Sequence, residues 1–260
     1  MAKRPTHLVI PDPHAHPDYE NLRFRALGNF IVEKRPDSII CVGDFADMPS
    51  LSSYDKGKLS YEKRRYQRDI DAVIDAQEEL FKPLRAYNKK AKNQYRPNLV
   101  LTMGNHEYRI VREVQEYPGL EGKLSLADLR YEQYGWKVSP FLEPIAVDTI
   151  SYSHYFVSGV AGRPISGENI GKSLCNKLHA SAVQGHSHVF DHSERAIING
   201  TKIFGLSCGC YTHKSYVEEW NRATVAMWWN GVVLIQDIDG AGYYDALTAI
   251  TQRKLLREYL

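Results

Sequence analysis

The first 110 residues of the 260-residue chain alternate between short apolar runs and longer amphipathic segments, and few folds accommodate this alternation. The predicted strands span residues 6–11, 38–42 and 98–103. The predicted helices span residues 20–34 and a long segment from about residue 61, in which we expect Pro83 to kink or interrupt the helix. Strands that alternate with helices are typical of βαβ units, so we expect parallel strands.

After about residue 140 the pattern changes to short strands separated by turn residues. Asn199-Gly200 and Asn230-Gly231 each lie between β-rich runs, and Asn-Gly favours the type I′ turn of a tight hairpin. We therefore expect an antiparallel hairpin at each of these two positions. Two more helices are predicted at 168–180 and 243–258, and no linker separates domains. The sequence thus predicts two β-sheets packed together with helices outside, in a single domain 1–260.

Composition restricts the class of protein. The formal net charge is +2, from 33 basic and 31 acidic residues, which gives no general electrostatic reason to bind nucleic acid or membrane. No apolar run approaches the roughly 18 residues of a spanning helix, and the N-terminal run is too short for a signal peptide, so we expect a soluble, cytoplasmic protein without a membrane partner. The four cysteines form no CxxC pair. Cys208 and Cys210 fit alternation on a strand better than a metal pair. The oligomeric state is not predicted.

Histidine, aspartate and asparagine gather in four short motifs, each placed where a predicted strand ends. The motifs are Asp12-Pro-His14, Gly43-Asp44-Phe-Ala-Asp47, Gly104-Asn105-His106-Glu107 and Gly185-His186-Ser-His188. On an extended chain residues i and i+2 point to the same side, so two side chains of one motif can share an ion. In open α/β sheets the carboxyl ends of the strands form the ligand crevice. We therefore expect the four motifs to meet at one site.

The motifs DPH, GDFAD, GNHE and GHSH, in this order and with His154 between the last two, resemble those of the calcineurin-like metallophosphoesterases. This resemblance implies an α/β fold, namely a four-layer α/β/β/α sandwich of two packed mixed β-sheets flanked by helices. It also implies a hydrolase of phosphoester bonds with two metal ions. The implied ligands are Asp12, His14, Asp44 and His188 for one ion, with Asp44 bridging to a second ion held by Asn105, His154 and His186.

The implied ligands agree with the chemistry of divalent metals. Carboxylate, amide and imidazole without thiolate suit Mn²⁺, which we expect, with Fe, Zn²⁺ or Ni²⁺ as alternatives. Two such ions would lower the pKa of a bridging water, and we expect a metal-bridging hydroxide to be the nucleophile. From the resemblance, His106 assists the leaving oxygen and Asp47 orients His106. His179 competes with His154 for the variable middle position, but its helical surroundings favour packing or exposure.

Three departures from related families narrow the predicted chemistry. Met48 stands where protein serine/threonine phosphatases carry an arginine, so that phosphate clamp is absent. Asp47 stands where purple acid phosphatases use a tyrosine, so a ferric charge-transfer site is not implied. His106 is present, whereas the scaffold subunit of retromer lacks this histidine, which favours catalysis over a non-catalytic binding module on the same fold. The layout of residues 163–190 also resembles small phosphoesterases often encoded by bacteriophages.

The substrate is indicated less directly. The basic segment 54–68 carries Tyr54, Tyr61 and Tyr66, which could contact nucleic-acid phosphates and stack on bases, although a solvated helix start explains it as well. Two arginines are candidate phosphate contacts, namely Arg163 in a glycine-rich loop and Arg109 after GNHE. We expect a phosphodiesterase acting on nucleotide or nucleic-acid substrates. The alternative is a phosphomonoesterase that acts on proteins or small molecules.

Overall fold

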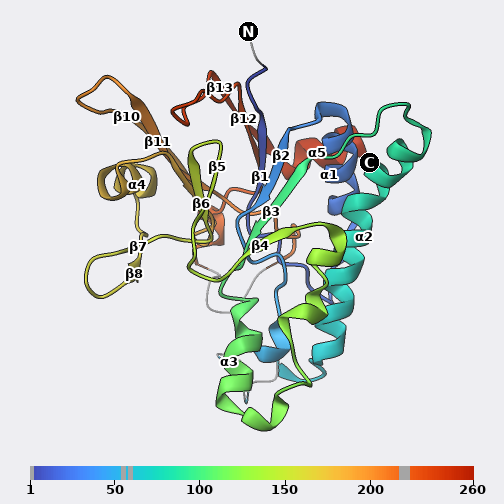
Figure 1. Cartoon of the computed structure of the whole chain (residues 1–260). Helices are drawn as coiled ribbons and strands as arrows, with labels where there is room; N and C mark the ends of the chain where they lie inside the picture. Colours follow the sequence, from blue (N-terminus) through green and yellow to red (C-terminus); the bar gives the residue numbers. More distant parts are fainter. Residues whose placement is uncertain (1–2, 54–56, 58–60, 217–222) are drawn as a thin grey trace.

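The computed structural model describes residues 3–53, 57, 61–216 and 223–260, and Figure 1 shows its two large sheets with helices on their outer sides. The first sheet has the strand order β13-β12-β1-β2-β3-β4. Its strands are β1 (His7–Ile10), β2 (Ser38–Cys41), β3 (Asn98–Thr102), β4 (Lys137–Ser139), β12 (Gly231–Gln236) and β13 (Ala246–Thr251). β1, β2 and β3 are parallel, as predicted, and β4, which the sequence analysis did not predict, continues the parallel order. β12 and β13 are antiparallel to their neighbours.

The second sheet has the order β10-β11-β9-β6-β5. Its strands are β5 (Ile145–Val147), β6 (Ile150–Ser153), β9 (Ala182–Gln184), β10 (Phe190–Ala196) and β11 (Lys202–Cys208), and a separate hairpin consists of β7 (Val157–Ser158) and β8 (Arg163–Pro164). β6 runs parallel to β9, with Ser153 opposite Gln184. The residues that follow these two strands therefore lie at the same end of the sheet.

Five α-helices are described. They are α1 (Leu22–Lys34), α2 (Tyr66–Lys90), α3 (Tyr108–Glu116), α4 (Ile170–Leu178) and α5 (Gln252–Tyr259), and short 3₁₀ helices occur at Pro49–Leu51, Pro118–Leu120, Leu126–Leu129, Glu132–Tyr134 and Val225–Met227. In Figure 1 α1, α2 and α5 lie on the outer side of the first sheet, and α4 lies on the outer side of the second. α3 directly follows β3, so its first turn lies beside the end of that strand.

Three apolar cores separate four layers. Leu8 and Ile10 of β1 lie in one core with Phe24 and Leu27 of α1. Val9 points to the opposite face of the same strand, where it meets the second sheet in a core that includes Phe204. Full burial of one such side chain contributes about 1.5–3 kcal/mol. A third core packs α4 on the second sheet. The predicted four-layer α/β/β/α sandwich is confirmed.

The hairpin predicted at Asn199-Gly200 is confirmed, because β10 and β11 pair up to Ala196 opposite Lys202. The hairpin predicted at Asn230-Gly231 is wrong. Gly231 begins β12, and Asn230 forms an isolated parallel bridge with Cys210. A Cβ at Gly231 would lie 2.3 Å from the carbonyl oxygen of Ile250, so this glycine permits a close approach of β13 and does not form a turn.

The helix predicted at 243–258 is also wrong in its first half. Residues 246–251 form β13, and α5 begins at Gln252, where the hydroxyl of Thr251 accepts a hydrogen bond from the Lys254 N–H at 3.3 Å. Pairing with β12 stabilises a strand here against the local helical pattern. The helix predicted at 168–180 is confirmed as α4. The long helix begins at Tyr66 and continues through Pro83 without the interruption we expected.

Candidate metal centre

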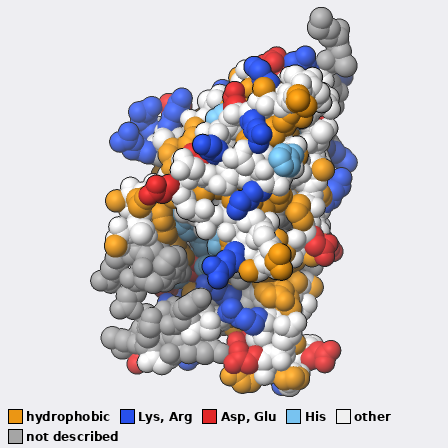
Figure 2. Space-filling model, turned by 90° about the vertical axis from the view of Figure 1, so that its left-hand side faces the viewer, with side chains coloured by type: hydrophobic (Ala, Val, Ile, Leu, Met, Phe, Trp, Pro, Cys, Tyr) orange, Lys and Arg blue, Asp and Glu red, His pale blue; other side chains and the backbone are white. Residues whose placement is uncertain are grey.

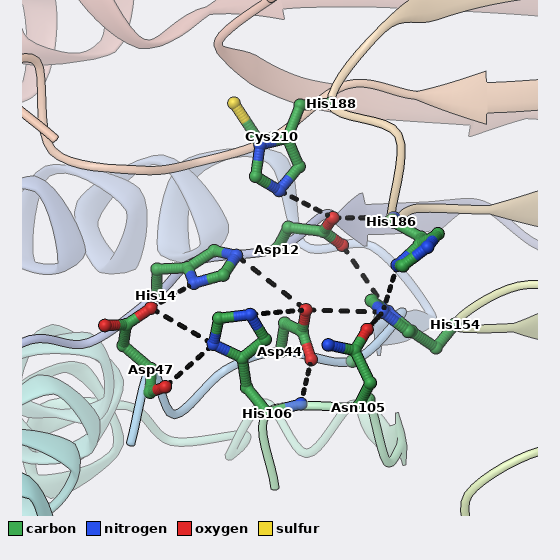
Figure 3. Close-up of polar contacts among 12 residues, drawn as sticks. Asp12, His14, Asp44, Asp47, Asn105, His106, His154, His186, His188 and Cys210 are labelled. Atoms are coloured by element: carbon green, nitrogen blue, oxygen red, sulfur yellow. Dashed lines mark hydrogen bonds and ion pairs between the residues drawn. The ribbon is translucent and has the colours of Figure 1, made fainter. Parts of the chain in front are cut away.

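The ends of five strands bring the predicted metal ligands together (Figure 3). The ligand atoms of three groups lie within 4.8 Å of one another: Asp12, His14 and His188; His14, Asp44 and His106; and Asp44, His154 and His186. The first sheet contributes the segments after β1, β2 and β3, and the second sheet contributes those after β6 and β9. The site therefore lies where the carboxyl ends of parallel strands from both sheets meet.

Lone pairs converge at the Nε2 atom of His154. Its Nδ1–H donates to the carbonyl oxygen of Val42 at 2.9 Å, which leaves Nε2 with a lone pair in the neutral ring. Nε2 lies 2.9 Å from Oδ1 of Asn105, 3.2 Å from Nδ1 of His186 and 3.3 Å from Oδ2 of Asp44. The oxygens of Asn105 and Asp44 are acceptors as well. Such a group needs a cation between its members, either a proton or a metal ion.

Asp12, His14 and His188 form a second group of acceptor atoms. Nε2 of His188 lies 3.1 Å from Oδ2 of Asp12, and Nε2 of His14 lies 3.8 Å from Oδ2 of Asp44. Oδ1 of Asp12 and Nε2 of His14 are buried without a hydrogen-bond partner among the described residues. Because unpaired buried polar atoms are costly, these two atoms fit metal ligands. Asp44 lies between the two groups, where one carboxylate can serve both.

The backbone around the site is held in a conformation that most side chains avoid. The left-handed φ values are 38° for Asp12, 45° for His14, 48° for Asp44, 68° for His186 and 58° for His188. Such values cost about 1–2 kcal/mol per residue and cluster at functional sites. Two motif glycines leave room for the carboxylates of the site. A Cβ at Gly104 would lie 2.0 Å from Oδ1 of Asp44, and a Cβ at Gly185 would lie 2.1 Å from Oδ1 of Asp12.

Charges in the site shift the pKa values of its groups. Burial lowers the pKa of His154, but the carboxylates of Asp44 and Asp12 outweigh it and raise this pKa to about 9. Burial and the neighbouring His154 lower the pKa of His186 to about 4, so its ring is neutral near pH 7. Burial raises the pKa of the Asp44 carboxyl, but His154 and His106 hold it well below its usual range. Without a metal ion, the cluster thus retains a proton that a divalent ion would displace.

Asp47 contacts more than the residue it was predicted to orient. Its Oδ1 accepts a hydrogen bond from Nδ1 of His14 at 2.6 Å and one from the hydroxyl of Tyr216 at 2.7 Å. Nδ1 of His106 lies farther from the same oxygen, at 3.2 Å, and donates to the backbone carbonyl of Asp47 at 2.7 Å. Asp47 therefore contacts His106, as expected, and also fixes the ring of His14.

Arg109 lies beside His106. Nη2 of Arg109 donates to Nε2 of His106 at 3.1 Å, and Nη1 donates to the carbonyl oxygens of Asp47 and Met48 at 2.9 and 3.3 Å. The residue is only 7% exposed and makes no ion pair with a described Asp or Glu. A buried guanidinium without a carboxylate partner is suited to an anionic ligand.

The other substrate candidates lie apart from these contacts. Arg163 is exposed on β8, where the glycine-rich segment forms the β7–β8 hairpin, and its side chain bonds to none of the described residues. The hydroxyl of Tyr61 donates to the Ser50 carbonyl and that of Tyr66 to Asp128, whereas Tyr54 lies outside the described residues. His179, the competitor of His154, is exposed at the end of α4.

Aromatic residues that the motif analysis did not find surround the imidazoles. The ring of Tyr155 lies 4.6 Å from that of His186, Trp228 lies 4.1 Å from His188 and Tyr216 lies 5.1 Å from His14. They follow the motifs or come from distant loops, so no spacing in the sequence could indicate them. In Figure 2 histidine side chains (pale blue) lie in a depression with Lys and Arg side chains (blue) beside it.

Two further findings concern the cysteines and the length of the helices. All four cysteines are buried and free, which agrees with structural thiols, and Cys208 is the last residue of β11. Among the described residues, no helix has both the length and the apolar composition that a membrane crossing requires.

Comparison with known proteins gives a family match over most of the chain. The family model described as calcineurin-like phosphoesterase matches residues 6–250. Among solved structures, Yfce, a phosphoesterase from E. coli, is 12% identical with a TM-score of 0.39, covering 95% of this chain and 100% of that chain. A predicted phosphoesterase from Streptococcus pneumoniae TIGR4 is 13% identical with a TM-score of 0.31, covering 96% and 98%. Neither TM-score is high enough to bear on function, and no curated protein sequence matches.

The matched residues include all four motifs and His154. The fold and the cluster of carboxylates and imidazoles define a metal-dependent hydrolase of phosphoester bonds. The chain belongs to the calcineurin-like phosphoesterase family. The resemblance noted in the sequence is thereby confirmed.

Proposed function

We propose that the protein hydrolyses phosphodiester bonds of nucleotides or nucleic acids with two Mn²⁺ ions. Asp12, His14, Asp44 and His188 would hold one ion, and Asp44, Asn105, His154 and His186 would hold the other. The observation that carries the proposal is the meeting of acceptor atoms at Nε2 of His154, 2.9 Å from Asn105 and 3.3 Å from Asp44. When bound, two such ions activate water and neutralise phosphoryl oxygens.

The protein's own groups would complete the reaction. In the structure Nε2 of His106 accepts a hydrogen bond from Arg109, so the ring would have to carry protons on both nitrogens in order to donate a hydrogen bond or a proton from Nε2 to the leaving oxygen, a contribution of about 10²–10⁴ in rate. Its Nδ1–H is anchored on the Asp47 carbonyl at 2.7 Å, so the ring presents Nε2 to the site. Arg109, whose Nη2 lies 3.1 Å from that Nε2, would pair with a phosphoryl oxygen. Arg163 is kept as a more distant candidate for the same task.

The preference for nucleotides or nucleic acids rests on local charge. In the described part of 54–68, Lys63 and Arg65 are exposed, and Arg68 is half exposed beside Asp18. Because nucleic-acid affinity comes largely from such cations, this segment favours a polyanionic substrate. The preference for nucleotides or nucleic acids can be tested by comparing their hydrolysis with that of simple phosphoesters.

The test compares hydrolysis of bis(p-nitrophenyl) phosphate with that of p-nitrophenyl phosphate after metal removal and addition of Mn²⁺. We expect turnover that depends on Mn²⁺, is faster on the diester and is abolished in Asp44→Asn. Faster turnover of the monoester would make the protein a phosphomonoesterase. Full activity of Asp44→Asn after chelation and return of Mn²⁺ would contradict the ligand assignment.

A further inference from the structure

Glu107 is the one acidic residue of the four motifs for which the proposed reaction has no use. Its side chain is fully buried at the start of α3, directly after Asn105 and His106. An ionised carboxylate has about four acceptor positions. A carboxylate is buried at little cost only when these positions are filled, so its partners indicate what it does.

All four positions of Glu107 are filled from three parts of the chain. Oε2 accepts from the backbone N–H groups of Asp44 at 3.1 Å and Gly104 at 2.9 Å. Oε1 accepts from the N–H of Ala46 at 2.9 Å and from the hydroxyl of Tyr131 at 2.9 Å. One carboxylate therefore joins the loop after β2 to the loop after β3, and Tyr131 supports it from behind.

These two loops carry Asp44, which would be shared between the metal ions, and Asn105, which would hold one of them. Asp44 has a left-handed φ of 48°, and its Oδ1 accepts the N–H of His106 at 2.9 Å (Figure 3). Gly104 lies so close to Asp44 that a Cβ there would clash with the carboxylate. The hydrogen bond from the Asp44 N–H to Glu107 holds this residue in a conformation that it would otherwise avoid.

We infer that Glu107 is a positioning residue that holds Asp44 between the two metal sites, so that both ions bind together. The inference rests on the proposed two-metal function. The hydrogen bonds of the Glu107 carboxylate go to backbone N–H groups and the Tyr131 hydroxyl and to none of the candidate ligand atoms, so it acts through the backbone of Asp44 and Gly104. Loss of such a supporting contact typically weakens metal binding about 10- to 100-fold.

The experiment measures Mn²⁺ binding by titration calorimetry and the exchange coupling between two bound Mn²⁺ ions by electron paramagnetic resonance. In Glu107→Gln an amide N–H₂ replaces one oxygen and must face backbone N–H groups or the Tyr131 hydroxyl. We expect the metal-free variant to fold. It should bind the weaker of the two Mn²⁺ ions about 10- to 100-fold less tightly than the wild-type protein and should lose the signal of two exchange-coupled ions. Tyr131→Phe removes one of the four hydrogen bonds and should show a smaller loss. Asp69→Asn is the matched control, a buried acid outside the site, and should keep wild-type binding.

Wild-type affinity and a coupled signal in Glu107→Gln would overturn the inference. If circular dichroism shows that this variant is unfolded, Glu107→Asp, which keeps the charge but is too short to join both loops, is measured with the same expectation. Loss of the fold in both variants would also contradict the inference, because Glu107 would then support the whole fold. A wild-type protein that fails to bind two ions would instead contradict the proposed function.

Discussion

Nδ1 of His14 lies 2.6 Å from Oδ1 of Asp47, and this contact joins the loop after β1 to the loop after β2 behind the candidate metal centre. The contact fixes which nitrogen of His14 carries the proton, because an ionised carboxylate accepts only from Nδ1–H. Nε2 of His14 then carries a lone pair, and this atom is buried without a hydrogen-bond partner among the described residues. A histidine held by a carboxylate in this way is typical of metal sites.

Asp47→Asn should therefore weaken metal binding as well as catalysis. The amide is a poorer acceptor for His14, so we expect Mn²⁺ affinity to fall about 10- to 100-fold. Titration calorimetry on the metal-free protein measures this change. Tyr216→Phe, which removes only the second donor to the same oxygen, is the matched control and should cause a smaller loss. Unchanged affinity in Asp47→Asn would restrict Asp47 to its contact with His106.

His106→Gln should slow turnover without a change in metal binding. If His106 assists the leaving oxygen, the rate should fall about 10²–10⁴-fold for an alkyl ester, whose leaving group is a strong base. The loss should be much smaller for p-nitrophenyl esters, whose leaving group needs little help. Rates for a series of leaving groups, at saturating Mn²⁺, measure the difference. An equal loss for every leaving group would show that His106 does another task.

Arg109→Met should raise the KM for phosphoesters at least tenfold while the Mn²⁺ affinity stays within about threefold of wild type, because a charged hydrogen bond contributes about 1.5–3 kcal/mol. Arg163→Met, on the exposed β8, serves as the comparison and should have a smaller effect. Steady-state kinetics on the diester give both values. A larger rise in KM in Arg163→Met than in Arg109→Met would show that the β7–β8 hairpin contacts the substrate and that Arg109 supports only His106.

The buried carboxyl of Asp69, which is not a predicted metal ligand, leads us to expect a pH dependence of stability. Burial raises the pKa of its carboxyl to about 6, above the 3.8 of an exposed group. The stability it contributes is therefore full below about pH 4 and is lost as the pH rises through 6. Asp69→Asn should stabilise the protein by about 1–3 kcal/mol at pH 7.5 and by little at pH 4.

Urea unfolding of the metal-free Asp69→Asn and wild-type proteins at the two pH values measures this difference. The Oδ1 of an asparagine can still accept the Ser50 N–H that Asp69 accepts at 2.9 Å, so the substitution changes the charge more than the hydrogen bonding. An equal effect at both pH values would show that folding does not raise the pKa of the Asp69 carboxyl.

The two packed sheets and the position of each motif after a strand could be predicted from the sequence, because both depend on local patterns. Alternation on β1 sends Leu8 and Val9 to different cores, as a buried strand requires. The misplaced elements depend on distant partners. Gly231 stands where β13 approaches, and residues 246–251 are a strand because β12 is available to pair with them. Neither fact can be found within the segment itself.

In the candidate site, too, contacts between sequence neighbours could be predicted and contacts between distant residues could not. Asp12 and His14 were expected to act together because alternate residues of an extended chain point to the same side. They do come together, but beyond the end of β1 and with left-handed φ values of 38° and 45°, so strand geometry is not the reason. Tyr216 donates to Asp47 across 169 positions of sequence, and no spacing indicates that contact. The role of Glu107 was hidden for a different reason: it acts on backbone N–H groups, which every residue but proline has.

The central claim is that Asp44 lies between two bound metal ions. The most direct test is anomalous diffraction at the manganese edge from crystals of the wild-type protein grown with Mn²⁺. We predict two anomalous peaks about 3.5–4 Å apart on either side of the Asp44 carboxylate, one beside His14 and one beside His154. A single peak, or peaks elsewhere in the molecule, would contradict the account.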